Sequence, residues 1–142
     1  MTVYLDSSVI LRRLLGQSGA LREWRLVRTG VSSRLAEVEC LRTLDRLRLD
    51  AALDEKRLAT LREALYAVLA TLEIVEITRA VLTRAAQPSP TSLGTLDALH
   101  LSSALIWRER TGRNLAMATH DEALATAARA YGLAAIGISR KA

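Results

Sequence analysis

Three acidic residues occupy similar places along the chain and are the first candidates for a reactive site. Asp6 directly follows the apolar segment Thr2–Leu5, and Asp121 comes two residues after the apolar segment Leu115–Thr119. Asp97 stands in the first turn expected of a helix that follows a loop. In open α/β sheets, ligands bind beyond the carboxyl ends of the strands. Asp6 and Asp121 are therefore expected to project into one acidic crevice.

A cluster of carboxylates implies a divalent cation. Two carboxylates at ~4 Å repel each other by roughly 1 to 4 kcal/mol, and hard cations such as Mg²⁺ or Mn²⁺ relieve that repulsion. Asp97 and Asp121 also have a simpler explanation, because acids favour the N-terminal turn of a helix through its dipole. Asp6 is harder to explain in this way, since a carboxylate beside an apolar strand is costly to bury without amide or cation partners.

Other chemistries lack the residues that they need. The chain has no GxxxxGK[ST] loop, no GxGxxG after the first apolar segment and no second aspartate two positions after Asp6. His100 and His120 are the only histidines, and we interpret them as a helix-surface residue and a loop residue. The single cysteine, Cys40, has no partner for a disulfide or a zinc site, and we interpret it as buried filler.

Composition favours one globular domain, residues 1–142, with a nucleic-acid or acidic protein partner. The net charge is +5, and Lys56 and Lys141 are the only lysines among 20 basic residues. Arginine pairs well with phosphate and carboxylate. Aromatic residues make up 4% of the chain, which argues against a base-stacking platform.

No apolar run reaches the length of a membrane span, so we expect a cytoplasmic protein without a membrane partner.

Short apolar strands alternate with helices along the chain. We expect strands at Thr2–Leu5, Val31–Ser33, Leu72–Ile77, Leu115–Thr119 and Leu133–Ile138. We expect helices from about Val9, capped by Ser7 or Ser8, and over Ala20–Arg28 (ended by Gly30), Arg34–Leu49, Asp54–Ala70, Thr78–Ala86, Thr95–Arg110 and Asp121–Gly132. Asp54, Thr78, Thr95 and Asp121 are the expected N-caps. This order predicts an α/β/α sandwich around a mainly parallel sheet.

Four segments resemble the motifs of PIN domains, in the family's order. The first is Tyr4–Ile10, an apolar strand followed by an aspartate and a small polar pair. Residues 32–42 are similar to the second acidic motif, residues 95–104 to the third, and residues 118–124 to the fourth. The chain's length also resembles that of VapC-like toxins, which are ribonucleases held inactive by a VapB-like antitoxin. The resemblance covers most of the chain.

The resemblance implies a PIN-like sandwich with four or five parallel strands and a Mg²⁺-dependent endoribonuclease that attacks RNA with a metal-activated water. Mn²⁺ can substitute. The resemblance further implies a homodimer and a cognate VapB-like antitoxin. The family's catalytic and metal-binding acids correspond here to Asp6, Glu39, Asp97 and Asp121.

The second acid of this set has a competitor. Glu37 lies two residues before Glu39, and apolar residues flank both, so a helical wheel does not decide between them. We prefer Glu39, because the family's glutamate usually follows the Ser-Ser pair at this distance and has an arginine three residues later, here Arg42.

Two alternatives to a ribonuclease stay open at this point. One is a non-catalytic nucleic-acid or protein binding module that retains the PIN fold, and the other is a metal-dependent DNA nuclease or phosphatase of related fold. For the antitoxin, the expected helices Ala20–Arg28 and Asp54–Ala70 offer a groove in which a partner helix can pack.

Overall fold

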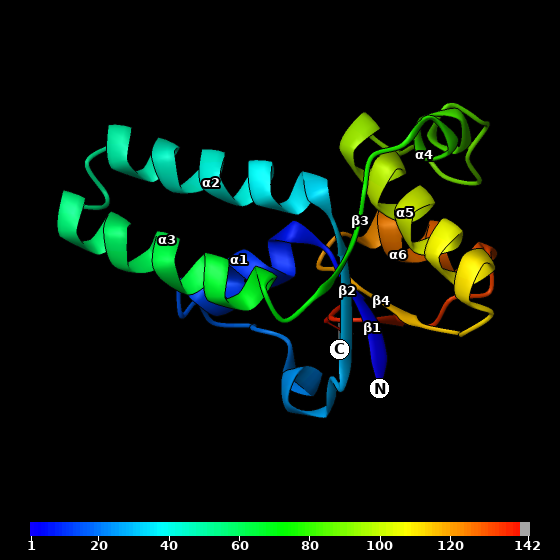
Figure 1. The fold of residues 1–142 in the computed structure, drawn as a ribbon, viewed down its shortest axis with the longest axis horizontal. Helices are drawn as coiled ribbons and strands as arrows, with labels where there is room; N and C mark the ends of the chain where they lie inside the picture. Colours follow the sequence, from blue (N-terminus) through cyan, green and yellow to red (C-terminus); the bar gives the residue numbers. More distant parts are fainter. Residues whose placement is uncertain (140–142) are drawn as a thin grey trace.

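The computed structural model describes residues 1–139, and a parallel sheet runs through its centre (Figure 1). In these residues the sheet has five strands, in the order β3-β2-β1-β4-β5. Their bounds are β1 Thr2–Leu5, β2 Thr29–Ser33, β3 Glu73–Val75, β4 Ala116–Ala118 and β5 Ala135–Ile136. Every pair of neighbours is parallel. The carboxyl ends of all strands therefore point to the same edge of the sheet.

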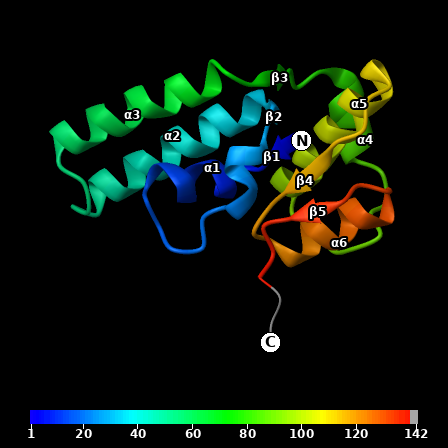
Figure 2. The ribbon, with the colours of Figure 1, turned by 90° about the horizontal axis from the view of Figure 1, so that it is seen from below.

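Helices cover both faces of this sheet, which confirms the predicted sandwich (Figures 1 and 2). One face carries α1 (Ser7–Leu14), α2 (Arg34–Leu49) and α3 (Glu55–Leu69). The other carries α4 (Arg79–Ala85), α5 (Thr95–Thr111) and α6 (Glu122–Ala130). Within residues 1–139, every helix is too short or too polar to cross a membrane.

The alternation of side chains along β1 divides the core into two layers. Val3 and Leu5 point to the face of α1, α2 and α3, where they join Ala36 and Cys40. Tyr4 points to the opposite face, where it joins the core beneath α5. Successive side chains of a strand face opposite ways, so a strand covered on both sides is apolar throughout. Cys40 is fully buried, as expected.

Helix α5 is enclosed rather than amphipathic. Every residue from His100 to Trp107 is buried, because the helix lies between the sheet and α4 and α6. The prediction that His100 lies on a helix surface is therefore wrong. A helix that is covered all round has no solvent-facing side on which a polar residue can be placed.

Several predicted helix boundaries are confirmed. Helix α2 has the predicted bounds, and Asp54 caps α3 by accepting from the backbone N–H of Arg57 at 2.7 Å. Thr78 caps α4. Asp121 caps α6, and its carboxylate accepts from the backbone N–H of Leu124 at 2.8 Å.

The predicted helix Ala20–Arg28 is wrong. Only a short 3₁₀ turn, η1 (Arg22–Leu26), forms there. Gly30 does not end a helix but lies inside β2, where a Cβ atom would stand 2.5 Å from Cδ2 of Leu72. A larger residue here would have to displace the end of the Leu72 side chain, so this glycine serves close packing and not a turn.

Other elements differ from the predictions at their ends. The strands predicted at Leu72–Ile77, Leu115–Thr119 and Leu133–Ile138 are present but at least two residues shorter, because each pairs only where a neighbour runs alongside. Gly94, rather than Thr95, is the N-cap residue of α5, and it has no side chain to make the cap bond.

Candidate active site

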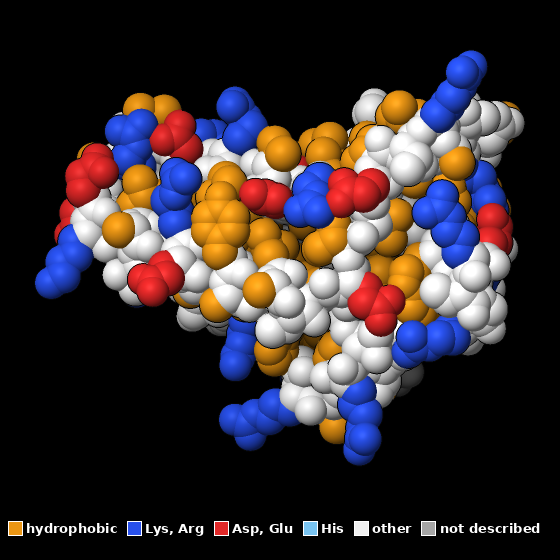
Figure 3. Space-filling model, in the orientation of Figure 1, with side chains coloured by type: hydrophobic (Ala, Val, Ile, Leu, Met, Phe, Trp, Pro, Cys, Tyr) orange, Lys and Arg blue, Asp and Glu red, His pale blue; other side chains and the backbone are white. Residues whose placement is uncertain are grey.

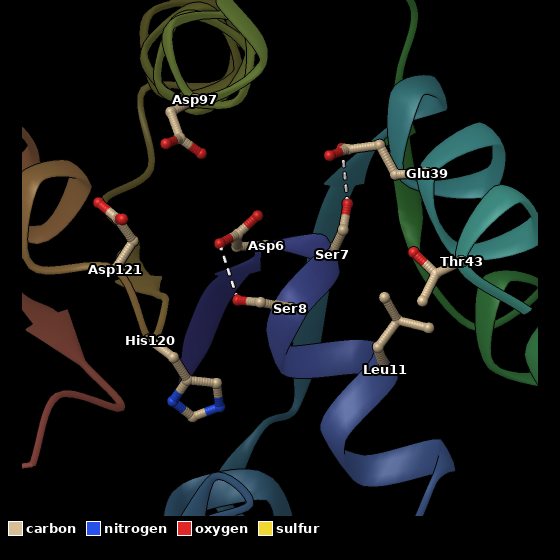
Figure 4. A pocket seen from close by; sticks show the side chains of 9 residues that line it. All are labelled: Asp6, Ser7, Ser8, Leu11, Glu39, Thr43, Asp97, His120 and Asp121. Atoms are coloured by element: carbon tan, nitrogen blue, oxygen red, sulfur yellow. Dashed lines mark hydrogen bonds between the residues drawn. The ribbon is translucent and has the colours of Figure 1, made fainter. Parts of the chain in front are cut away.

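An open pocket of about 400 Å³ lies at the carboxyl ends of β1 and β4 (Figure 4). All four acids selected in the sequence line it, and they come from four separate segments of the chain. Figure 4 shows their carboxylates facing a common space. The lining residues are Asp6, Ser7, Ser8, Leu11, Glu39, Thr43, Asp97, His120 and Asp121.

Asp6 is held at the centre of the site by two hydroxyl groups. Its Oδ2 accepts from Ser8 at 3.0 Å and from Thr119 at 2.9 Å, while its backbone N–H donates to the carbonyl of Ala118. The residue is almost fully buried. Both side-chain bonds end on one oxygen, so Oδ1 has no hydrogen bond within the described residues and faces the pocket.

The serines after Asp6 do not cap α1. The helix begins at Ser7 with Asp6 in the N-cap position, and no side chain makes a cap hydrogen bond. Instead Ser8 donates to Asp6, and Ser7 donates to Oε1 of Glu39 at 2.7 Å. The predicted cap residues are thus used to hold the acids.

Asp97 and Asp121 face Asp6 from the other side of the pocket (Figure 4). Burial, followed by the repulsion of Asp6 and Asp121, raises the pKa of Asp97 to about 6. Asp121 uses Oδ1 for its cap bond to Leu124 and keeps Oδ2 free of hydrogen bonds in the described part of the chain. The raised pKa of Asp97 therefore reflects first the burial of its carboxyl group and second the negative charges that face it.

Glu39 and Glu37 lie on different faces of α2. Glu39 lines the acidic pocket, whereas Glu37 lies 3.4 Å from Arg34 in an ion pair and borders a separate hollow beside α3. Burial raises the pKa of Glu39, but the hydrogen bond and charge of His100 outweigh it and hold that pKa below its ordinary value. The geometry therefore brings Glu39, and not Glu37, together with the three aspartates.

His100 lies directly behind the acids. Its Nε2 is 2.5 Å from Oε1 of Glu39 and 3.6 Å from Oδ1 of Asp6, and its Nδ1 is 2.6 Å from the hydroxyl of Tyr4. Burial lowers the pKa of His100, yet the two carboxylates reverse that effect and raise it. The sequence signal for this position is a histidine between two leucines, Leu99 and Leu101, within an apolar helix.

His120 lies in the loop after β4, as predicted, and forms part of the pocket wall. Its Nδ1 donates to the carbonyl of Gly137 at 2.7 Å. Its Nε2 is buried and has no hydrogen-bond partner among residues 1–139.

The site fits a hard divalent cation by its chemistry. As they stand, no three acidic, histidine or cysteine side chains of residues 1–139 converge closely enough to hold a metal ion. Mg²⁺ does not require this, because it keeps several waters and binds one or two carboxylates together with substrate phosphates. Each acid offers it at least one oxygen without a hydrogen bond in the described residues: Oδ1 of Asp6, Oε2 of Glu39, Oδ2 of Asp121 and the carboxylate of Asp97.

Among the described residues, no arginine or lysine lines this pocket. Figure 3 shows Lys and Arg side chains at many separate places on one face, several of them beside acidic ones. Within the described residues, four of the arginines are engaged in exposed ion pairs: Arg34 with Glu76, Arg48 with Asp45, Arg84 with Glu109 and Arg113 with Glu73. Exposed pairs of this kind contribute about 1 kcal/mol or less to stability.

Comparison with known proteins shows the family of this chain. A family model described as the PIN domain matches residues 3–131. The chain belongs to the PIN-domain family. It is 36% identical to Ribonuclease VapC46 of Mycobacterium tuberculosis over 141 residues, covering 96% of this chain and 98% of that protein.

Solved structures share the PIN fold at low sequence identity. The crystal structure of FitAcB from Neisseria gonorrhoeae superposes with a TM-score of 0.72 at 19% identity, covering 94% of this chain and 96% of that one. A toxin–antitoxin complex from Klebsiella pneumoniae superposes with a TM-score of 0.64 at 16% identity, covering 87% and 90%. At these identities the likeness concerns the fold.

The four acids that line this pocket were selected from their motifs, but the groups that hold them were not. Sequence reasoning misses Thr119 and His100 as partners of the acids, and it assigns Ser7 and Ser8 to a different task. The hydrogen bonds of Thr119 and His100 join residues 113 and 61 positions apart. Such contacts depend on strand pairing and leave no local pattern.

Proposed function

We propose that this protein is a Mg²⁺-dependent endoribonuclease, the toxin component of a VapBC-like toxin–antitoxin module, with Asp6, Glu39, Asp97 and Asp121 as its metal-binding and catalytic residues. One observation carries the proposal. Four carboxylates from four separate segments face one open pocket, and each keeps an oxygen free of hydrogen bonds in the described residues. A non-catalytic binding module has no need of all four.

The relatives support the substrate and the partner. The relative at 36% identity is named a ribonuclease, which supports RNA as the substrate. A structural neighbour is a toxin–antitoxin complex, which supports a VapB-like antitoxin as the partner. RNA and such an antitoxin are both found in the cytoplasm, and we expect the activity in that compartment.

In the proposed mechanism Asp6 and Asp97 are the principal ligands of Mg²⁺, for which Mn²⁺ can substitute. When bound, the cation lowers the pKa of a water molecule and stabilises the leaving oxygen of the phosphodiester. Ser8 and Thr119 fix Asp6, so that its Oδ1 stays directed into the pocket. Asp97, with its raised pKa, gains most from a neighbouring positive charge.

Glu39 stays ionised at neutral pH because its pKa lies below the ordinary value. A carboxylate in this state can bind the cation or accept a proton from the attacking water. Asp121 completes the site through its free Oδ2, directly or through a water molecule. The pocket is open to solvent, which supports access of a single-stranded RNA backbone.

The test is cleavage of single-stranded RNA with Mg²⁺, with Mn²⁺ and with excess EDTA. We expect cleavage with either metal, none with EDTA, and products with 5′-phosphate and 3′-hydroxyl ends. Single-stranded DNA and a small phosphate ester, tested in parallel, distinguish a ribonuclease from a DNA nuclease or phosphatase. Undiminished cleavage in EDTA would refute the metal mechanism. Cyclic phosphate products would show attack by the 2′-hydroxyl instead.

The acidic pocket also supports a specific mode of inhibition. A basic side chain of the antitoxin, placed among the carboxylates, would compete with the cation for the same oxygens. The helix-in-groove site predicted between Ala20–Arg28 and Asp54–Ala70 is not available in that form, because the first segment contains only the 3₁₀ turn η1. We therefore base the proposal on the charge of the pocket.

This inhibition is tested with the purified pair. With the wild-type antitoxin bound, raising the Mg²⁺ concentration should progressively restore cleavage. An antitoxin whose basic residues near the pocket are changed to alanine should inhibit less at low Mg²⁺. Equal inhibition by both antitoxins at every metal concentration would exclude the competition.

A further inference from the structure

A buried histidine stands behind Glu39 and takes no part in the proposed metal site. His100 is fully buried in α5, and its ring lies between the first strand and α2. Its Nε2 lies within hydrogen-bonding distance of Oε1 of Glu39 and of the Ser7 hydroxyl, at 2.5 and 3.2 Å. A histidine with no other task would not be expected in an apolar helix, because burying a polar ring is costly unless its nitrogens are bonded.

The direction of these bonds follows from the chemistry of the partners. A carboxylate accepts hydrogen bonds and does not donate them, so Nε2 of His100 carries a hydrogen and donates to Glu39. The hydroxyl of Tyr4 faces Nδ1 at 2.6 Å and can act as donor or acceptor. The contact with Glu39 therefore persists whether the ring is neutral or protonated.

Both bonds to Glu39 end on the same oxygen. Oε1 accepts from Nε2 of His100 and from the hydroxyl of Ser7, at 2.5 and 2.7 Å. Oε2 has no hydrogen-bond partner among residues 1–139, and Figure 4 shows the carboxylate turned toward the three aspartates. A glutamate side chain has several rotatable bonds. Here the two hydrogen bonds to Oε1 fix the direction in which Oε2 points.

We infer that His100, anchored by Tyr4, is a positioning residue that holds Glu39 with Oε2 directed into the acidic pocket. This inference rests on the proposed function, since it assigns the task of Glu39 to that pocket. A partner behind a ligating or catalytic carboxylate typically contributes about 10- to 100-fold to metal affinity or activity. His100 acts through Glu39 and does not touch the substrate.

Three variants separate the hydrogen bond from the packing. His100→Leu removes both nitrogens but fills the space, and His100→Asn is polar but too short to reach Glu39. His100→Gln can place an amide N–H close to the position of Nε2. We expect the first two to lower kcat for RNA cleavage by about 10- to 100-fold with KM changed less than about 3-fold, and His100→Gln to recover part of kcat. Ser102→Ala, a buried change on the same helix away from Glu39, is the control.

A double-mutant cycle with Glu39→Gln tests whether His100 acts through Glu39. If it does, adding His100→Leu to Glu39→Gln weakens Mn²⁺ binding no further than Glu39→Gln alone does. Multiplying losses would show that His100 has a general structural role and would overturn the inference. Wild-type kcat in both His100→Leu and His100→Asn would overturn it as well.

Two measurements do not depend on cleavage. The Nε2–H proton of His100 should give a strongly downfield ¹H NMR signal in the wild-type protein, and this signal should disappear in Glu39→Gln. Mn²⁺ binding, followed by electron paramagnetic resonance, should be weaker in His100→Leu by about 10-fold. If the wild-type protein cleaves no RNA, the proposed function fails by itself. Unchanged Mn²⁺ affinity together with an NMR signal that survives Glu39→Gln would then reject the positioning role independently.

Discussion

Thr119, at the end of β4, donates its hydroxyl hydrogen to Oδ2 of Asp6, at the end of β1, over 2.9 Å. The same hydroxyl accepts from the backbone N–H of Asp121 at 3.1 Å. One fully buried side chain therefore fixes the relative positions of two proposed metal-binding acids. Strand pairing between β1 and β4 makes this possible, because Leu5 lies opposite Ala118 in the sheet.

Thr119→Val should impair the site more than the fold. The substitution keeps the shape of the side chain but leaves the Asp121 N–H without its acceptor and Asp6 with one donor fewer. We expect cleavage to fall by about 10- to 100-fold and the free energy of unfolding by about 1 to 3 kcal/mol. Thr119→Ser, which keeps the hydroxyl, should stay near wild type in cleavage. Equal rates for the valine and serine variants would contradict this account.

Glu39→Gln should abolish cleavage, and Glu37→Gln should leave most of it. Glu39 lines the pocket, whereas Glu37 is paired with Arg34 on another face of α2. Both variants should remain folded, as judged by circular dichroism, because Glu37 is in an exposed ion pair of little energetic weight. The reverse pattern of activities would show that the second acid of the site is Glu37.

Asp97 should make the metal-free protein less stable as the pH rises from about 4 to above 6. Its pKa is raised from 3.8 to about 6 in the folded protein, so over this range the folded state binds more protons than the unfolded state. Stability therefore falls with increasing pH through the window. Asp97→Asn removes this contribution.

Thermal unfolding in EDTA checks this effect. The melting temperature of Asp97→Asn minus that of wild type should increase between pH 4 and pH 7. Added Mg²⁺ at pH 7 should stabilise wild type more than the variant. A difference in melting temperature that is the same at both pH values would mean that folding does not raise the pKa of Asp97.

Gly137→Ala should destabilise the edge of the sheet that carries His120. Gly137 has a φ of +92°, and a Cβ there would stand 2.7 Å from the carbonyl oxygen of Thr119. We expect a loss of about 2 to 4 kcal/mol in urea unfolding, from backbone strain and overpacking together.

Gly112→Ala is the matched control for this substitution. Gly112 also has a positive φ, +67°, but a Cβ there would meet nothing within 4 Å. Its cost should be limited to the conformational penalty of about 1 to 2 kcal/mol. If the two variants lose the same stability, the contact with Thr119 is unimportant.

Much of the fold was predictable from local chemistry. Asp54, Thr78 and Asp121 cap helices as expected, because a short polar side chain before an apolar periodic segment has few other uses. The parallel sheet followed from apolar strands that alternate with helices. The four acids were selected from their motifs, and all four line one pocket.

The remaining features depend on contacts between distant residues. Gly30 packs closely against Leu72 of the neighbouring segment, and no residue next to Gly30 in the sequence indicates this contact. His100 is buried because α5 is covered on every side, a property of the packing rather than of the helix itself. Ser7 and Ser8 have the right type and place for helix caps, and only the positions of Asp6 and Glu39 decide otherwise.

The strand order β3-β2-β1-β4-β5 also bears on the synthesis of the chain. The first strand is made long before its neighbour β4, residues Ala116–Ala118. A nascent chain that has not reached Thr119 and Asp121 lacks both the hydroxyl that donates to Asp6 and the carboxylate of Asp121. The proposed nuclease therefore has an incomplete site on the ribosome until Thr119 and Asp121 have been made.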